Sequence, residues 1–272
     1  MNSHARIRRR VRMARERPPG MRLAFARIPL ERRLPRPFAL RTLVFATGRS
    51  RRELAGYLDE VAADRDLHEH VAAAEKEYQR LSPEFDAGTL SGQEGELLYA
   101  LVRAIRPLRI VETGTANGVS TTFLLAALER NGTGTMVSID LPFLDDDGRL
   151  EPVVEGTSID LYDASPVPPG KRPGWIVPDR LRARWELRLG DARALLPAAV
   201  AEGELGLFFH DSLHTREHML FEFETAWPRI GVGGVLAADD VFHRKHDALP
   251  AFARSVGRPW RSFGGLGFIR KP

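Results

Sequence analysis

The chain has 272 residues, 43% of them apolar, which suits one large domain or a domain with an appendage. It has no Cys, which excludes disulfide bonds, thiolate zinc ligands and a thiol nucleophile, and fits a cytoplasmic location. No apolar run is long enough to span a membrane. Residues 1–52 carry 16 of the 40 basic residues but 2 of the 36 acidic ones, leaving 24 basic and 34 acidic residues, a net of −10, in the rest. This acidic body argues against a broad nucleic-acid surface.

The arginine-rich N-terminal segment differs in composition from everything that follows. Residues 1–50 contain no Lys and no Asp, and their arginines include the run RIRRRVRMARER. Such a composition favours a solvated, flexible arm. Binding to anionic lipid or RNA, or a role as a targeting peptide, remains open from the sequence.

Two helical stretches come next. Residues 51–81 are rich in Ala, Leu, Glu and Arg, with apolar residues spaced by three and four, so they are expected to be helical. Residues 91–105 predict a second amphipathic helix, with Ser91 and Glu94 as a capping box. We expect residues 51–106 to form a helical cap that covers a site, mediates dimerisation, or both.

Short apolar segments then alternate with helical ones. The expected strands are residues 108–114, 136–140, 185–192, 205–211 and 235–241, and the expected helices are 120–130, 192–203 and 214–230. This alternation predicts βαβ crossovers and a parallel sheet with helices on both faces. The last segment predicts an antiparallel hairpin around Gly264 and Gly265. Residues 107–272 are therefore expected to form an α/β domain with a Rossmann-like, doubly wound, mostly parallel sheet.

One long segment interrupts this rhythm. Residues 142–180 are rich in Pro, Gly and Asp and follow the second expected strand. Open α/β sheets bind ligands at the carboxyl ends of their strands, and long loops in compact domains are often functional. A lid-like insertion over a binding site and an insertion without a role are both open.

A glycine turn connects the first expected strand to its helix. Gly114 and Gly118 allow a tight turn, with Thr115 between them, and the helix that follows favours an anionic group. Their spacing is G-x-x-x-G and lacks the G-x-G-x-x-G fingerprint of dinucleotide sites, which disfavours a nucleotide-dependent oxidoreductase. Glu112 would repel a pyrophosphate but attract an ammonium group. Asp140, at the end of the next strand, suits ribose hydroxyls.

The third expected strand ends in Gly-Asp-Ala. Asp191 and Ala192 stand where this strand meets its helix, at the same edge of the sheet as the glycine turn. They could border an adenine ring. Together the three strand ends predict a ligand that has a ribose and an amino group and needs no phosphate pocket.

These motifs resemble those of a known enzyme class. The segments VETGTANGVS, GDA and GGVLAADDV, with Asp140, are similar to class I S-adenosylmethionine-dependent methyltransferases. The segments G-W-x-V-P and HDSLHT and the late Asp-Asp pair resemble bacterial metal-dependent O-methyltransferases of catechol and antibiotic-sugar type. The resemblance covers about residues 91–270 and implies a seven-stranded sheet whose last strand is antiparallel. The cofactor contacts that it implies are Glu112, Gly114, Ser120, Asp140 and Asp191.

Three acidic residues follow two neighbouring expected strands. Asp211 ends one buried strand, and Asp239 and Asp240 end the next. Three carboxylates this close raise one another's pKa unless a cation lies among them. An all-oxygen site suits Mg²⁺ or Mn²⁺, and the resembling enzymes bind a divalent ion with acids at these positions. His214, three residues after Asp211, is the candidate general base.

A zinc-protease motif overlaps this region. The sequence H-T-R-E-H, from His214 to His218, matches H-x-x-E-H, with Glu217 as the activating acid. The motif begins where a strand ends, and no Glu follows Glu224 to supply a third ligand. We therefore favour the carboxylate site, with His218 as a structural residue.

These features predict a cytoplasmic enzyme that transfers a methyl group from S-adenosylmethionine to a small-molecule hydroxyl with the help of a divalent cation, expected to be Mg²⁺. A sugar, a catechol or a natural product would serve as acceptor. The alternatives are a metal-independent methyltransferase acting on RNA or protein, and a non-catalytic cofactor-binding scaffold.

Overall fold

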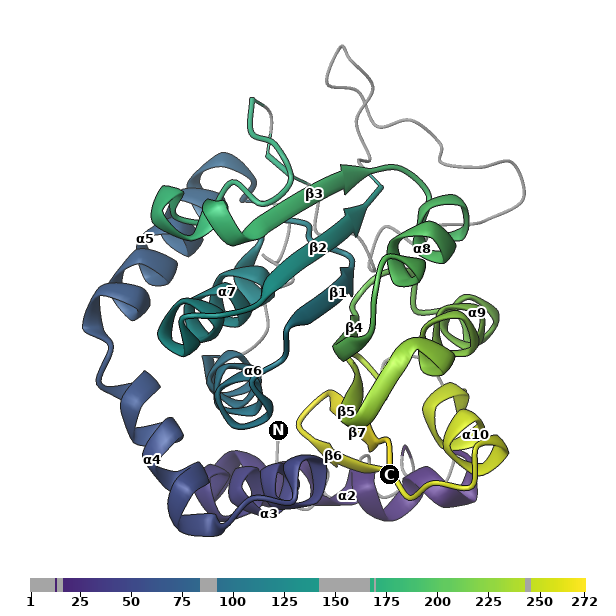
Figure 1. The fold of residues 1–272 in the computed structure, drawn as a ribbon. Coiled ribbons are helices and arrows are strands. Elements are labelled where there is room, and N and C mark those ends of the chain that lie inside the picture. The colour runs from purple at the N-terminus through teal and green to yellow at the C-terminus, as the bar shows by residue number, and fades with distance from the viewer. Residues whose placement is uncertain (1–12, 14–16, 84–91, 142–166, 169, 243–245) are drawn as a thin grey trace.

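The computed structural model describes residues 13, 17–83, 92–141, 167–168, 170–242 and 246–272 (Figure 1). The strands of this part are β1 (Arg109–Thr113), β2 (Thr135–Asp140), β3 (Trp185–Leu189), β4 (Leu205–His210), β5 (Ile230–Ala238), β6 (Arg261–Phe263) and β7 (Leu266–Arg270). They form one seven-stranded sheet in the order β3-β2-β1-β4-β5-β7-β6. The first five strands are parallel, and β7 runs antiparallel between β5 and β6. The predicted mostly parallel sheet with an antiparallel C-terminal hairpin is confirmed.

Helices cover both faces of the sheet (Figure 1). On one face lie α6 (Gly92–Ile105) and α7 (Val119–Asn131), and on the other lie α8 (Ala192–Ala201), α9 (Arg216–Ala226) and α10 (Ala248–Ser255). Neighbouring strand residues point to opposite faces, so Ile110 packs with α6 and α7 while Val111 packs with the other layer. Because both faces are buried, the central strands are mostly apolar, and Glu112 of β1 is a fully buried exception.

The N-terminal segment differs from its prediction. Residues 1–50 were expected to form a flexible arm, but within them α2 (Pro19–Arg33) and α3 (Pro35–Thr47) are helices. Met21, Phe25 and Ile28 of α2 are buried, at the three- and four-residue spacing of an amphipathic helix. The abundance of arginine concealed this apolar stripe. Residues 1–12 and 14–16 of the expected arm lie outside the described residues.

Polar contacts tie these helices to the C-terminal hairpin. Nη2 of Arg27 donates to the carbonyl oxygen of Ser262 at 2.7 Å, and the amide of Gly264 donates to the Glu31 carboxylate at 2.9 Å. Glu31, which is 1% exposed, also pairs with Arg27. Oγ1 of Thr42, in α3, also donates to the Ser262 carbonyl oxygen, at 3.2 Å. The helices α2 and α3 therefore belong to the folded body of the protein.

The expected helix over 51–81 is two helices. They are α4 (Arg51–Ala62) and α5 (Arg65–Leu81), and the Asp64 side chain caps α5 by accepting from the amide of Leu67. Such a cap begins a new helix. The remaining elements are two 3₁₀ helices, η2 (Asp179–Arg184) and η3 (Trp227–Arg229), and α10, which the sequence analysis did not predict. No helix in the described ranges is long and apolar enough to cross a membrane.

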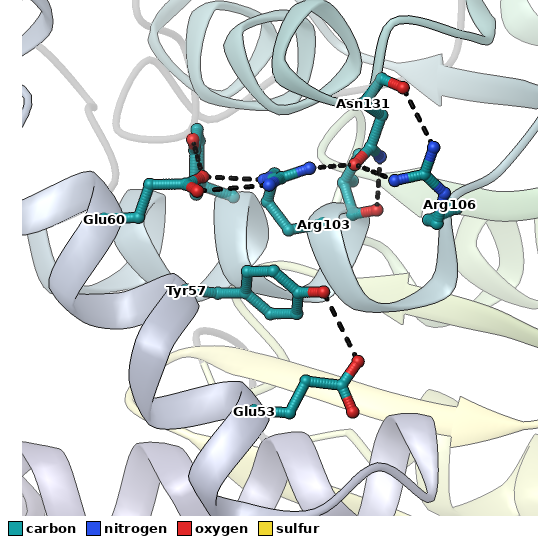
Figure 2. A network of polar contacts seen from close by, with 8 residues as sticks. Glu53, Tyr57, Glu60, Arg103, Arg106 and Asn131 are labelled. Carbon is teal, nitrogen blue, oxygen red and sulfur yellow. Dashed lines mark hydrogen bonds and ion pairs between the residues drawn. The ribbon is translucent and has the colours of Figure 1, made fainter.

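A polar network joins α4, α6 and α7 (Figure 2). Arg103 donates to the two carboxylate oxygens of Glu60 at 2.7 and 3.1 Å and also bonds to Asn131. The Tyr99 hydroxyl donates to the same Glu60 carboxylate at 2.5 Å. These contacts attach α4 to the helix layer that covers β1. They lie at the end of the sheet where β1 and β2 begin, because Arg103 and Asn131 are in the last turns of the helices that precede these strands.

Candidate functional site

The glycine turn after β1 has the backbone that its sequence predicts. Gly114 and Gly118 have positive φ values of 84° and 94°, and Ala116 between them has φ 43°. A Cβ atom on Gly114 would lie 1.9 Å from the carbonyl oxygen of Asp211, so only glycine fits there. The turn thus lies directly against the end of β4 and leads into the N-terminus of α7.

Asp140 fixes this turn from the neighbouring strand. Its Oδ1 accepts from the backbone amides of Thr115 at 3.0 Å and Ala116 at 3.4 Å. Burial raises the pKa of Asp140, although these two hydrogen bonds oppose the shift. The predicted ribose-binding acid and the predicted glycine turn therefore form one unit at the carboxyl ends of β1 and β2.

Glu112 and Ser120 lie behind the turn. Glu112 is fully buried, and its carboxylate accepts from the hydroxyls of Ser120, Thr121 and Ser138 at 2.7–2.8 Å. Burial raises the pKa of Glu112 to about 7, although the three hydroxyl bonds act in the opposite direction. These two residues contact each other and brace β1, β2 and α7. Their predicted contact with the cofactor stays a prediction.

The end of β3 completes this side of the edge. The amide of Gly190 donates to the carbonyl of Asp140 at 2.8 Å, which places Asp191 and Ala192 beside β2. The Asp191 side chain caps α8 by accepting from the amide of Arg193 at 2.8 Å. The structure therefore brings the predicted cofactor residues of three strand ends to one rim.

The G-W-x-V-P segment packs over the glycine turn. The amide of Gly174 donates to the carbonyl of Ala116 at 2.8 Å, and the amide of Ile176 donates to the carbonyl of Asn117 at 3.1 Å. The Trp175 indole donates to Oδ1 of Asn117 at 2.8 Å. This end of the expected 142–180 insertion thus borders the site, whereas residues 142–166 and 169 lie outside the described residues.

The three predicted metal ligands also come together. Asp211 follows β4, and Asp239 and Asp240 follow β5. Burial and the charges of Asp239 and Asp240 raise the pKa of Asp211 well above its usual range. Burial and the charge of Asp240, followed by that of Glu94, raise the pKa of Asp239 in the same way. The carboxylates therefore lie close enough to repel one another.

Glu94 is a fourth acid at this rim that the sequence analysis did not assign to it. A Cβ atom on Gly265 would lie 3.2 Å from Oδ1 of Asp239, 3.5 Å from Oε1 of Glu94 and 3.7 Å from Oδ1 of Asp240. Oε1 of Glu94 accepts from the amide of Gly265 at 2.7 Å. The sequence analysis assigned Glu94 only to a capping box. Ser91, the other half of that box, lies outside the described residues.

The oxygen donors have the chemistry of a hard-cation site, but they do not form a closed ligand set. Within the described ranges, no three His, Asp or Glu side chains are arranged so that they could hold a metal ion. Asp240 has an unusual backbone, with φ 50°, which Asp tolerates better than most residues. The acidic rim is defined here as Glu94, Asp211, Asp239 and Asp240.

His214 lies beside the acidic rim. Its Nε2 is 3.7 Å from Oδ1 of Asp211, and its side chain is 7% exposed. Its carbonyl oxygen contacts Nε2 of His246 at 3.0 Å. The structure thus places the predicted general base at the edge where the predicted ligands meet.

Residues 111–241 match a family described as a methyltransferase domain. The chain carries a methyltransferase domain. This segment includes the glycine turn, Asp140, Asp191, Asp211 and Asp240. The predicted resemblance to class I S-adenosylmethionine-dependent methyltransferases is confirmed for this domain.

Solved structures share the fold of the methyltransferase domain. Cofactor-bound Rv0187 from MTB has a TM-score of 0.51 and 18% identity, over 79% of this chain and 94% of that one. A putative caffeoyl-CoA O-methyltransferase from Staphylococcus aureus has a TM-score of 0.50 and 14% identity, over 76% and 96%. The SAH-bound methyltransferase PaMTH1 from Podospora anserina has a TM-score of 0.49 and 16% identity, over 77% and 97%. No curated protein sequence matches the chain significantly.

The zinc-protease interpretation does not agree with the geometry of the methyltransferase domain. The Glu217 side chain is 86% exposed and lies 3.6 Å from Arg193. Nε2 of His218 bonds to the Glu222 carboxylate at 2.9 Å, whereas His214 lies against Asp211. The two histidines therefore serve different partners, and the motif does not assemble a metal site.

Proposed function

We propose that this domain transfers the methyl group of S-adenosylmethionine to a hydroxyl group of a small molecule. The close approach of Gly114 to Asp211 carries the proposal, since a Cβ atom would stand 1.9 Å from the Asp211 carbonyl oxygen. This contact joins the glycine turn, which lacks the fingerprint of a phosphate-binding loop, to the acidic rim and His214. A methyl donor and a hydroxyl acceptor would meet across this junction.

The cofactor would lie along the carboxyl ends of β1, β2 and β3. Asp140 would accept hydrogen bonds from the ribose hydroxyls while its Oδ1 holds the turn. The N-terminus of α7 would attract the carboxylate of the methionine part. Asp191 and Ala192, beside β2, would border the adenine.

The acceptor would bind at the acidic rim. His214, 3.7 Å from the Asp211 carboxylate, would remove the proton from the acceptor hydroxyl as the methyl group transfers. The Asp211 carboxylate would orient the imidazole. Most of the rate gain would come from holding donor and acceptor in line.

Asp211, Asp239 and Asp240 would hold a divalent cation, as the oxygen chemistry of these side chains suits Mg²⁺. The raised pKa values of Asp211 and Asp239 support this assignment, because a cation would relieve the repulsion among the three carboxylates. Such an ion polarises an acceptor oxygen and lowers its pKa.

A methyl-transfer assay tests the proposal. Purified protein is incubated with S-adenosylmethionine and a panel of catechols, sugars with vicinal diols and hydroxy acids, with Mg²⁺ or with EDTA, and products are identified by mass spectrometry. We expect a methyl ether on at least one acceptor and much slower formation in EDTA. A product in which nitrogen or carbon is methylated, with no methyl ether from any acceptor, would contradict the proposal. Equal rates in Mg²⁺ and EDTA would contradict the metal assignment alone.

A further inference from the structure

A buried carboxylate, Glu222, lies beneath the acidic rim and has no part in the proposed chemistry. It is on α9 and is 0% exposed. A charged group is buried at such a cost only when its partners compensate it fully. The residues that donate hydrogen bonds to Glu222 therefore indicate its role.

Four side chains surround this carboxylate. Oε2 accepts from the Thr113 hydroxyl at 2.6 Å and from Nδ1 of His210 at 2.5 Å. Oε1 accepts from the Ser212 hydroxyl at 2.8 Å and from Nε2 of His218 at 2.9 Å. Burial alone would raise the pKa of Glu222, but the His210 charge and the hydrogen bonds from both histidines hold it well below its usual range.

These partners come from the elements that form the site. Thr113 ends β1, directly before Gly114, and His210 ends β4. His210 and Ser212 are the two chain neighbours of Asp211, so both sides of Asp211 are tied to one buried anion. The amide of Asp211 itself donates to the Thr113 carbonyl at 2.8 Å.

Glu222 also holds His214 in place, through His210. The rings of His210 and His214 meet edge to face, with centroids 5.2 Å apart and planes at 77°. An ionised carboxylate only accepts hydrogen bonds, so Nδ1 of His210 carries a proton and the ring is fixed in orientation. The fixed ring of His210 forms the wall against which His214 packs.

We infer that Glu222 is the positioning residue of the proposed methyl transfer. It sets the β4–α9 loop, residues 211–215, so that Asp211 and His214 face the cofactor turn. This inference rests on the proposed function for its catalytic consequence, but the loop position can be measured without turnover. Small displacements of reacting groups cost about 100-fold in rate, so the loss of Glu222 should appear in kcat.

Two variants and a control separate positioning from general stability. Glu222→Gln keeps the shape of the side chain but replaces one carboxylate oxygen with an amide NH₂ group. That group is a donor, and the side chains that contact it are donors as well. Ser212→Ala removes only the bond from the loop. Thr225→Ala, also on α9, removes a hydroxyl bonded at 2.7 Å to the Phe221 carbonyl and lies away from the site.

The experiment measures amide hydrogen exchange of residues 211–215, the affinity for S-adenosylhomocysteine, and kcat and KM for S-adenosylmethionine. We expect Glu222→Gln and Ser212→Ala to speed exchange in this loop by about tenfold or more, since a lost hydrogen bond to a charged group permits local opening. The kcat of Glu222→Gln should fall by about 100-fold with KM within about twofold of wild type. Thr225→Ala should change none of these values.

Wild-type exchange and wild-type kcat in Glu222→Gln would overturn the inference, as would equal losses in Thr225→Ala. If Glu222→Gln does not fold, Ser212→Ala decides by the same criteria. The protein could bind S-adenosylhomocysteine and methylate no acceptor, while the variants still show faster loop exchange. That result would support the positioning role and reject the proposed function.

Discussion

Gly114 and Asp211 are in direct backbone contact. The site of a Gly114 Cβ atom is 1.9 Å from the Asp211 carbonyl oxygen, and Gly114 has φ 84°. The turn that would hold the cofactor and the strand end that begins the acidic rim are therefore one junction.

Gly114→Ala should disrupt both parts at once. The added methyl group meets backbone atoms, which cannot rotate away, and the positive φ adds strain. We expect a loss of about 2–4 kcal/mol in the free energy of unfolding and no measurable binding of S-adenosylhomocysteine. Denaturant unfolding and calorimetry measure the two effects.

The control for this variant is Gly132→Ala. Gly132 has φ 69°, but no atom lies within 4 Å of its Cβ position. It should lose only about 1 kcal/mol through backbone strain and should bind the cofactor product normally. A Gly114→Ala variant that behaves like this control would show that the junction is not rigid.

The buried Glu112 should make stability depend on pH. Its pKa is raised to about 7 in the folded state, so the folded protein binds the proton more tightly than the unfolded chain does. The stability that protonated Glu112 provides is complete below the unfolded-state pKa near 4.5 and is lost as pH rises through about 7. Over this window the contribution to the free energy of unfolding falls by about 3 kcal/mol.

Glu112→Gln isolates that effect, because the other ionisable groups remain. Between pH 4.5 and pH 8, wild type should lose about 3 kcal/mol of unfolding free energy relative to the variant. Urea unfolding at several pH values measures it. A difference that stays constant across this range would show that Glu112 keeps an ordinary pKa.

The repulsion among the carboxylates of the acidic rim should lower the stability of the protein, which can be measured without any substrate. Asp239→Asn removes one of the like charges but keeps an oxygen that can accept from the Asp240 amide. Without metal at pH 8 this variant should be about 1–2 kcal/mol more stable than wild type, because Asp211 is relieved of a neighbouring charge. Mg²⁺ should raise the Tm of wild type only.

Asp179→Asn is the matched control, since the Asp179 side chain is fully exposed on η2. It should leave the stability and the effect of Mg²⁺ unchanged. Equal stabilisation of wild type and Asp239→Asn by Mg²⁺ would show that the ion binds elsewhere.

His214 should act in the chemical step. His214→Ala should lower kcat by about 10²–10⁴-fold while the affinity for S-adenosylhomocysteine stays within about twofold of wild type. Added imidazole should restore part of the rate by filling the space that the side chain leaves. A kcat close to wild type, or an equal loss of cofactor affinity, would assign His214 to structure.

The sequence predicted well which strand-end residues lie near one another. Parallel strands place their carboxyl ends at one edge, so Asp140, Asp211 and Asp239 could be brought together from the order of the strands alone. The glycine turn was predictable because two of its residues need positive φ.

The contacts that sequence analysis missed come from elements far apart in the chain. Glu94 reaches the rim because α6 packs beside the C-terminal hairpin, and its bond to Gly265 joins residues 171 positions apart. No local pattern encodes that pairing. Glu222 was equally hidden, since a Glu on a helix is usually exposed and only the fold shows that α9 turns it inward.

The N-terminal helices show a different limit. Composition led to the expectation of a flexible arm, because arginine dominates residues 1–50. A narrow stripe of Met21, Phe25 and Ile28 suffices for folding when a partner surface is present. The core layer that contains Phe242 supplies that surface, and the Phe25 and Phe242 rings meet edge to face although they are more than 200 residues apart in the chain.

Calorimetric titration of S-adenosylhomocysteine into wild type and Asp140→Ala tests most directly whether the glycine turn and Asp140 bind the cofactor. Asp140 is both the proposed ribose ligand and the acceptor for the Thr115 amide, at 3.0 Å. We expect wild type to bind one molecule per chain and the variant to bind at least about tenfold more weakly, as for the loss of a hydrogen bond to a charged group. No binding by wild type, or equal affinity in the two proteins, would contradict this expectation.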